Sequence, residues 1–197
     1  MFGWFKKNEE IPVQPSLDIT PTPEMIREEE ELLNQFLMHF IEKLSSSPEL
    51  NKDKINEIND LIKSNLRAFE RKEVKKLLNT GIPLTAIQKK ELGFNSRLKI
   101  CEDYLKFINI NETNKDDPFE FLVDAEFYAR ARSWSLRDIQ QAKNIGSKKI
   151  KLSVDEQTCP QSVKAKKFYI VNDAPLLPLK TCGNRCTCMY TAVVEWD

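Results

Sequence analysis

Four of the five cysteines lie near the C-terminal end of the chain, where their spacing favours a metal site. Cys182, Cys186 and Cys188 form the pattern Cys-x3-Cys-x-Cys, and Cys159 precedes them by 23 positions. Four thiolates make a complete tetrahedral ligand set for Zn²⁺. The segment holds few large apolar residues, so a metal would supply folding free energy, on the order of 10 kcal/mol in small zinc peptides. We therefore predict one structural zinc ion bound by Cys159, Cys182, Cys186 and Cys188.

Two other interpretations of these thiols stay open at the level of sequence. Free cysteines pack as small hydrophobic side chains, so all four can be ordinary reduced, half-buried thiols. A disulfide is the third interpretation, and it requires an oxidising compartment. The spacing also departs from a standard zinc ribbon, because Ser162 stands where a second thiol would complete a Cys-x2-Cys pair. The fifth cysteine, Cys101, falls on an apolar helical stripe and is predicted to be a core residue.

The residue types needed for common catalytic sites are sparse. The five glycines are scattered singly, so the chain has no glycine-rich phosphate loop. His39 is the only histidine, and no nucleophile lies near it in the sequence, so we expect it to be structural or exposed. A zinc ion with four protein ligands has no open position for water and is structural, not catalytic. These features favour a non-enzymatic protein.

Residues 119 to 192 resemble the C-terminal domain of phage head-morphogenesis proteins, the Mu F-like minor head family. The resemblance begins with an Ala- and Arg-rich helix (Ala125 to Arg132) that leads to Gly146, and continues through a lysine-rich strand. It then rests on the following short motifs: Asp155-x3-Cys159-Pro160, Lys167-Phe168-Tyr169, Asp173-Ala174-Pro175, Leu177-Pro178-Leu179 and Cys186-x-Cys188. The family usually has Cys-Pro-x-Cys early and His-x2-Cys-Arg-Cys late. Here Ser162 replaces the second thiol, Cys182 stands near the histidine position, and Thr187 replaces the arginine. The resemblance implies a phage or prophage origin and contact with portal or capsid components.

The distribution of charge adds a second, alternative function. The formal net charge is zero, but residues 130 to 167 hold ten Lys or Arg residues against three acids, whereas Glu24 and Glu28 to Glu31 make an acidic segment. A basic face can bind phosphate or an acidic partner. The alternative is therefore a nucleic-acid-associated module, and its expected contact residues are Arg130, Arg132, Arg137, Lys148, Lys149 and Lys151. The preferred interpretation is an interaction or scaffold protein that binds a protein partner or self-associates through its helical region.

Compartment and membrane association are predicted from the same pattern. No apolar run approaches the length of a membrane span. The first seven residues are aromatic and basic, but they are too short for the apolar core of a signal peptide. An odd number of cysteines without such a peptide indicates a reducing compartment, and we expect a cytoplasmic protein.

The N-terminal part of the chain predicts a tail followed by helices. Residues 1 to 22 read as a flexible tail and proline-rich linker. Residues 23 to 109 form a predicted helical region with a long hairpin. Its first helix starts at Thr22-Pro23, and its second is about 30 residues long, starting at Pro48 and ending before Gly81. A capping box at Thr85 to Gln88 begins a short helix, and Asn95 is expected to cap another.

A second module is predicted over residues 117 to 197. Asp117-Pro118 signals the start of a helix, which we expect to break at Ser133 to Ser135 and to end at Gly146. Strands are predicted at 150–154, where apolar and polar residues alternate, and at 168–171 and 189–194. The predicted fold is thus mainly α with a small C-terminal α+β module, in which a helical hairpin joins a cysteine-pinned antiparallel sheet.

Overall fold

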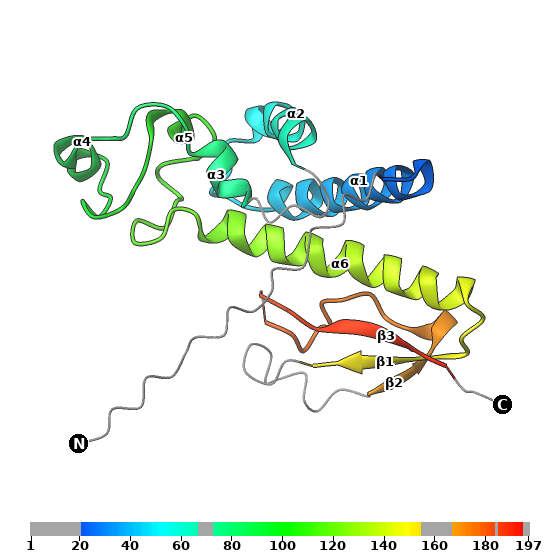
Figure 1. The fold of residues 1–197 in the computed structure, drawn as a ribbon. Helices are drawn as coiled ribbons and strands as arrows, with labels where there is room; N and C mark the ends of the chain where they lie inside the picture. The colour runs from blue at the N-terminus through cyan, green and yellow to red at the C-terminus, as the bar shows by residue number, and fades with distance from the viewer. Residues whose placement is uncertain (1–20, 67–72, 155–166, 184, 195–197) are drawn as a thin grey trace, which may run out of the picture.

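The computed structural model describes residues 21–66, 73–154, 167–183 and 185–194. A long helix, α6, runs through its centre, with helices on one side and a small sheet on the other (Figure 1). In chain order the elements are α1 (Pro23–Ser45), η1 (Lys52–Lys54), α2 (Ile55–Asn65), α3 (Val74–Leu78), α4 (Ala86–Glu91), α5 (Glu102–Leu105), α6 (Glu120–Asn144), β1 (Lys149–Ser153), β2 (Phe168–Ile170), η3 (Val171–Asp173) and β3 (Met189–Val193). The predicted class, mainly α with a small antiparallel C-terminal sheet, is confirmed.

Helix α1 begins as its sequence predicts. The Thr22 side chain accepts a hydrogen bond from the backbone N–H of Met25, and Pro23 occupies the first helical position. Its apolar stripe packs against α6 and α2 and makes one side of a buried cluster, the helical core. This core includes Phe40, Leu44, Ile58, Ile62, Tyr104, Leu122, Ala125 and Ala129.

The predicted 30-residue second helix is wrong. After α1 the chain first pairs Leu50 with Ile108, and Asn51 then caps the short 3-10 helix η1, so no helix starts at Pro48. Helix α2 ends at Asn65, and Leu66 is extended and buried. Helix α3 starts at Val74, whose backbone N–H donates to the Glu126 carboxylate of α6. The apolar helical pattern continues in the sequence, but this contact with a residue far along the chain starts a separate helix at Val74. Phe69, another residue of the predicted helix, lies outside the described residues.

The segment between α3 and α6 contains both a confirmed and a wrong prediction. The capping box at Thr85 and Gln88 is present. The helix expected from Asn95 is not formed, because the Asn95 side chain accepts from the Arg97 N–H and closes a turn instead. After this turn, Ile100 and Cys101 lie beside Leu84 and Pro83, and the backbone of Cys101 is extended. Of the helix predicted after Asn95, only the four residues of α5, Glu102–Leu105, are helical.

Helix α6 is continuous, so the predicted break at Ser133 to Ser135 is wrong. The hydroxyls of Ser133 and Ser135 donate to the backbone carbonyls of Arg130 and Arg132, one turn earlier, and are buried within the helix. Such back-bonding satisfies the serine hydroxyl without ending a helix. The helix ends as predicted at Gly146, whose φ of +71° is a conformation that favours glycine.

The sheet has the strand order β2-β1-β3 and is antiparallel throughout. Lys151 of β1 lies opposite Phe168 of β2, and Ser153 lies opposite Met189 of β3. The inner face packs against the C-terminal half of α6 to make a second cluster, the sheet core. It includes Ala131, Ile139, Ala142, Ile150, Leu152, Val171, Leu177 and Tyr190. Helix α6 therefore contributes to both cores: residues up to Ala129 to the first, and residues from Ala131 to the second.

Candidate metal centre

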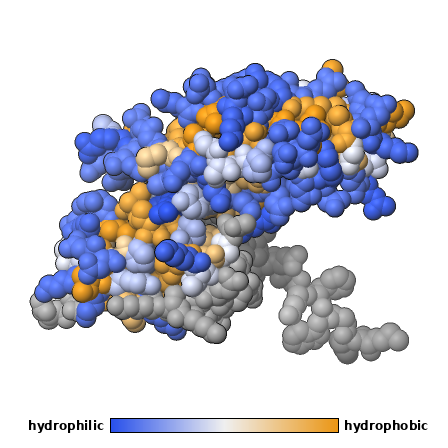
Figure 2. Space-filling model, turned by 180° about the vertical axis from the view of Figure 1, so that it is seen from behind, coloured by the Kyte–Doolittle hydropathy of each residue, from blue (hydrophilic) through white to orange (hydrophobic). Residues whose placement is uncertain are grey.

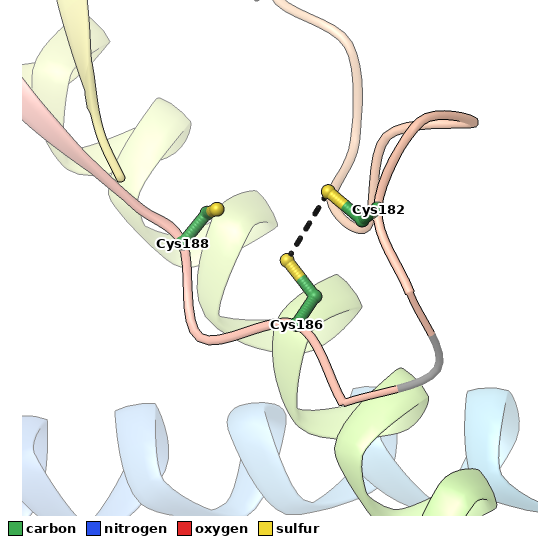
Figure 3. A group of neighbouring side chains, drawn as sticks. All are labelled: Cys182, Cys186 and Cys188. Atoms are coloured by element: carbon green, nitrogen blue, oxygen red, sulfur yellow. Dashed lines mark hydrogen bonds between the residues drawn. The ribbon is translucent and has the colours of Figure 1, made fainter. Parts of the chain in front are cut away.

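Three of the four predicted ligands meet at one edge of the sheet core. A loop leads from η3 across α6 to β3, and Cys182 lies in a turn of this loop that is closed by its own backbone N–H donating to Leu179. Cys186 and Cys188 follow on the approach to β3, and both are buried. Figure 3 shows the three thiol groups turned toward one shared space beside α6. The loop is positioned by Leu177, which is buried against α6 and whose N–H donates to the Ser135 hydroxyl at 3.2 Å.

The sulfur positions fit a single metal ion. The three Sγ atoms lie within 4.8 Å of one another, and the Cys186 thiol donates to Cys182 Sγ at 3.4 Å. A tetrahedral ion with Zn–S bonds of about 2.3 Å separates its sulfur atoms by about 3.8 Å. The observed spacing brackets that value, so small rotations of the side chains would bring all three thiolates onto one ion.

Burial determines the protonation of Cys186. It raises the pKa of Cys186 well above the usual range of a thiol; the hydrogen bond to Cys182 raises this pKa further, whereas a hydrogen bond with the Cys188 backbone lowers it in part. Without a cation, Cys186 is therefore a neutral thiol at physiological pH. Binding a divalent metal would displace the Cys186 proton and replace the buried thiol with a thiolate–metal bond.

The remaining cysteines fall elsewhere. Cys159, the predicted fourth ligand, lies outside the described residues. Cys101 is half-buried at the N-terminus of α5, far along the chain from the cluster, and does not belong to it. The prediction that Cys101 faces the core from inside a helix is wrong, because Cys101 has an extended backbone and stands at the N-cap of α5. All four described cysteines are free thiols.

The six predicted basic contact residues do not form one continuous basic face. Arg130 is ion-paired with Glu126 at 2.9 Å and lies over the Phe36 ring; Arg132 covers the Tyr128 ring. Arg137 pairs with Asp138 and stacks on Trp134. The three arginines are thus half-buried on α6 with partners in the chain. Lys148, Lys149 and Lys151 instead lie exposed at and beside β1.

One connection near the cysteines has no signal in the sequence. The Arg185 guanidinium, between Cys182 and Cys186, lies 3.4 Å from the Asp124 carboxylate on the N-terminal half of α6. A hollow of about 240 Å³ lies beside the Asp124 carboxylate. It is lined by Lys43 of α1, Tyr128 of α6 and Lys180 of the cysteine loop, among others. The cysteine loop therefore contacts the half of α6 that belongs to the helical core. Only the tertiary structure brings positions 124 and 185 together.

His39 is buried on α1, and its Nδ1 lies 3.2 Å from the Glu42 carboxylate. Among the described residues, the group that could hold a metal ion consists of Cys182, Cys186 and Cys188, and His39 does not belong to it. Its position in the α1 stripe agrees with the structural role expected from the sequence.

Comparison with known proteins adds no assignment. No protein-family model matches the chain, and neither a curated protein nor a solved structure is found to be similar to it. Among the helices of the described residues, none combines the length and apolar character needed to span a membrane.

Proposed function

We propose that this chain is a non-enzymatic interaction or scaffold protein whose C-terminal module is held by a structural Zn²⁺ ion. The observation that carries the proposal is the convergence of three thiols, two of them buried, at sulfur separations suited to one tetrahedral ion. Thiolate ligands in tetrahedral geometry are characteristic of zinc or iron–sulfur sites, and three sulfurs around a single point fit one ion.

The chain connectivity supports Cys159 as the fourth ligand. Ser153, near the end of β1, pairs with Met189, the residue directly after Cys188, so β1 ends beside the thiol cluster. Strand β2 begins at the same end, because the Leu152 N–H donates to the Lys167 carbonyl. Cys159 is five residues beyond Val154, and five residues can span at most about 17 Å. The cluster therefore lies within reach of Cys159.

The scaffold interpretation is preferred to the nucleic-acid alternative because of the arginines. Arg130, Arg132 and Arg137 are held by acidic and aromatic groups of the same chain, so they are poorly placed to bind phosphate. The proposed zinc ion instead fixes a loop that contacts both halves of α6.

The resemblance to minor head proteins extends the proposal to biological origin. Its motifs include Asp173-Ala174-Pro175, which begins at the last residue of η3, and Leu177-Pro178-Leu179, which lies in the loop between η3 and the cysteines. We propose on this basis a phage or prophage origin with a portal or capsid partner. Portal and capsid genes beside the coding sequence would support this part, and a neighbourhood without any phage genes would count against it.

The metal site is tested by the metal content of matched cysteine variants. The wild-type protein and the Cys101→Ser control, purified with zinc present, should each hold about one Zn²⁺ per chain by elemental mass spectrometry. Cys186→Ser should hold little. Co²⁺ substitution should give a thiolate-to-metal charge-transfer band that weakens in Cys159→Ser. The metal-site proposal fails if the folded wild-type protein binds no metal while its thiols react freely.

A further inference from the structure

The outer face of the sheet is exposed and combines apolar residues with lysines. In the β-register, Lys151 lies between Phe168 and Thr191, and Ser153 lies opposite Met189. Phe168 is 49%, Ile170 59% and Met189 53% exposed, which is high for side chains of this size. We define this outer sheet face as Lys149, Lys151, Phe168, Ile170, Met189 and Thr191. Exposed apolar groups arranged around positive charge are typical of an interaction surface.

The first two turns of α1 carry the complementary character. Residues 23–31 hold five glutamates and one arginine, a net charge of −4, and nearly all of them are exposed. Within the described structure none of these glutamates forms an ion pair. Met25 and Ile26 are 48% and 47% exposed among them. We call residues 23–31 the acidic end of α1.

These two surfaces cannot meet within one molecule. The inner face of the sheet packs on α6, so the outer sheet face points away from α6. Helix α1 packs along another side of α6, and Figure 1 shows α6 lying between α1 and the sheet. The acidic end of α1 can therefore reach an outer sheet face only on a different copy of the chain.

We propose that the protein self-associates head to tail, with the acidic end of α1 of one copy docked on the outer sheet face of the next. In this contact Met25 and Ile26 pack among Phe168, Ile170 and Met189, while the glutamates face Lys151 and its neighbours. Because the two contacting surfaces differ, each added copy still presents one free surface to the next copy. Association of this kind therefore continues into open chains, or closes into a ring if the geometry allows. The contact goes beyond the proposed scaffold role and does not require the metal ion.

The composition of the two surfaces favours a second copy over nucleic acid. Binding of a single strand relies on aromatic side chains on which bases stack. The outer sheet face has one exposed aromatic residue, Phe168, and its other apolar residues are Ile170 and Met189. Aliphatic side chains beside lysines match an acidic, apolar helix better than a row of bases. Figure 2 shows apolar residues on both the helical and the sheet halves of an otherwise mostly hydrophilic surface.

The test uses charge reversals that each disable one surface. Sedimentation velocity at low salt should show wild-type assemblies that grow with protein concentration and shrink as salt is added. Lys151→Glu, a sheet variant, and Glu28→Lys/Glu31→Lys, a helix variant, should each associate at least about tenfold more weakly, because like charges then face each other. Lys90→Glu, on the exposed surface of α4, is the control and should associate like the wild type.

Mixing the variants distinguishes head-to-tail association from any other kind. The sheet variant retains a normal acidic end and the helix variant a normal outer sheet face, and the two altered surfaces carry opposite charges to each other. An equimolar mixture should therefore associate more strongly than either variant alone, and combining all three substitutions in one chain should also restore association. Wild-type protein that stays monomeric, or a mixture that stays monomeric, overturns the proposal. The proposal is also overturned if the wild type is a monomer that binds an oligonucleotide and Lys151→Glu does not bind it. Metal content measured on the same samples separates this outcome from failure of the zinc site.

Discussion

At the scale of single residues, the cysteine loop is held by a small number of buried polar contacts. Ser135 uses its hydroxyl twice: it donates to the Arg132 carbonyl and accepts from the Leu177 N–H. Ser133 is equally buried on the same helix, but among the described residues its hydroxyl hydrogen-bonds only to its own helix, at the Arg130 carbonyl. The two serines therefore differ in whether they contact the loop that carries the thiols. A sequence pattern cannot reveal this difference, because both look like helix-breaking residues in one short run.

Ser135→Ala should destabilise the protein more than Ser133→Ala. The first substitution leaves the buried N–H of Leu177 without its acceptor, at a cost of about 1–3 kcal/mol. The second removes a hydroxyl whose only contact in the structure is within the helix, so we expect a change within about 0.5 kcal/mol in either direction. Urea unfolding followed by far-UV circular dichroism measures both. Equal effects would show that the contact between Ser135 and the loop contributes nothing to stability.

At the scale of elements, some helix ends are predicted from sequence and others are not. Thr22 and Thr85 cap as their residue types indicate, and Gly146 ends α6, because capping depends on local chemistry. The predicted starts at Pro48 and Asn95 are wrong. The other wrong predictions concern continuity: the stripe after Asn65 continues in the sequence but not in the helix, and α6 passes through Ser133 without a break. Continuity depends on distant partners, such as Glu126 for the N-terminus of α3, and these are invisible in a single sequence.

Gly146→Ala tests the turn that joins α6 to β1. A Cβ atom at this position would meet no atom within 4 Å, so its cost arises only from the positive φ, about 1 kcal/mol. Gly183→Ala is the matched control, since Gly183 also has open space around it and does not have a positive φ. Thermal unfolding should show a lower Tm for Gly146→Ala and an unchanged or slightly higher Tm for Gly183→Ala. A lowered Tm in the control alone would contradict this account.

At the scale of the whole molecule, α6 joins two cores that the sequence suggests are separate modules. The thiol cluster was predictable from the number and spacing of the cysteines, and three of the four predicted ligands do converge. What could not be predicted is how the cluster is connected to the rest of the molecule, through Leu177 on Ser135 and Arg185 beside Asp124. These pairs are separated by more than forty positions, so no local pattern encodes them.

If the proposed zinc ion is bound, its removal should loosen the sheet core selectively. A chelator strong enough to extract Zn²⁺ is expected to increase amide hydrogen exchange in β1 and β3 and in the C-terminal half of α6. Exchange at the helical-core residues Phe40 and Ile62 should change little, because their apolar contacts do not involve the sheet. Hydrogen-exchange mass spectrometry measures the difference, and Cys101→Ser should respond like the wild type. A uniform increase along the chain would show instead that the two cores unfold as one unit.

The dual contact of α6 also limits how the chain can change in length over evolution. Each added or lost residue in a helix rotates everything beyond it by about 100°. An insertion between Ala129, which faces the helical core, and Ala131, which faces the sheet core, would therefore turn one packed face away from its partner. In the turns and non-helical segments between α3 and α6, an added residue does not rotate a packed helical face in this way. Homologues of this protein should accordingly vary in length before residue 117 and keep a fixed number of residues from 120 to 144.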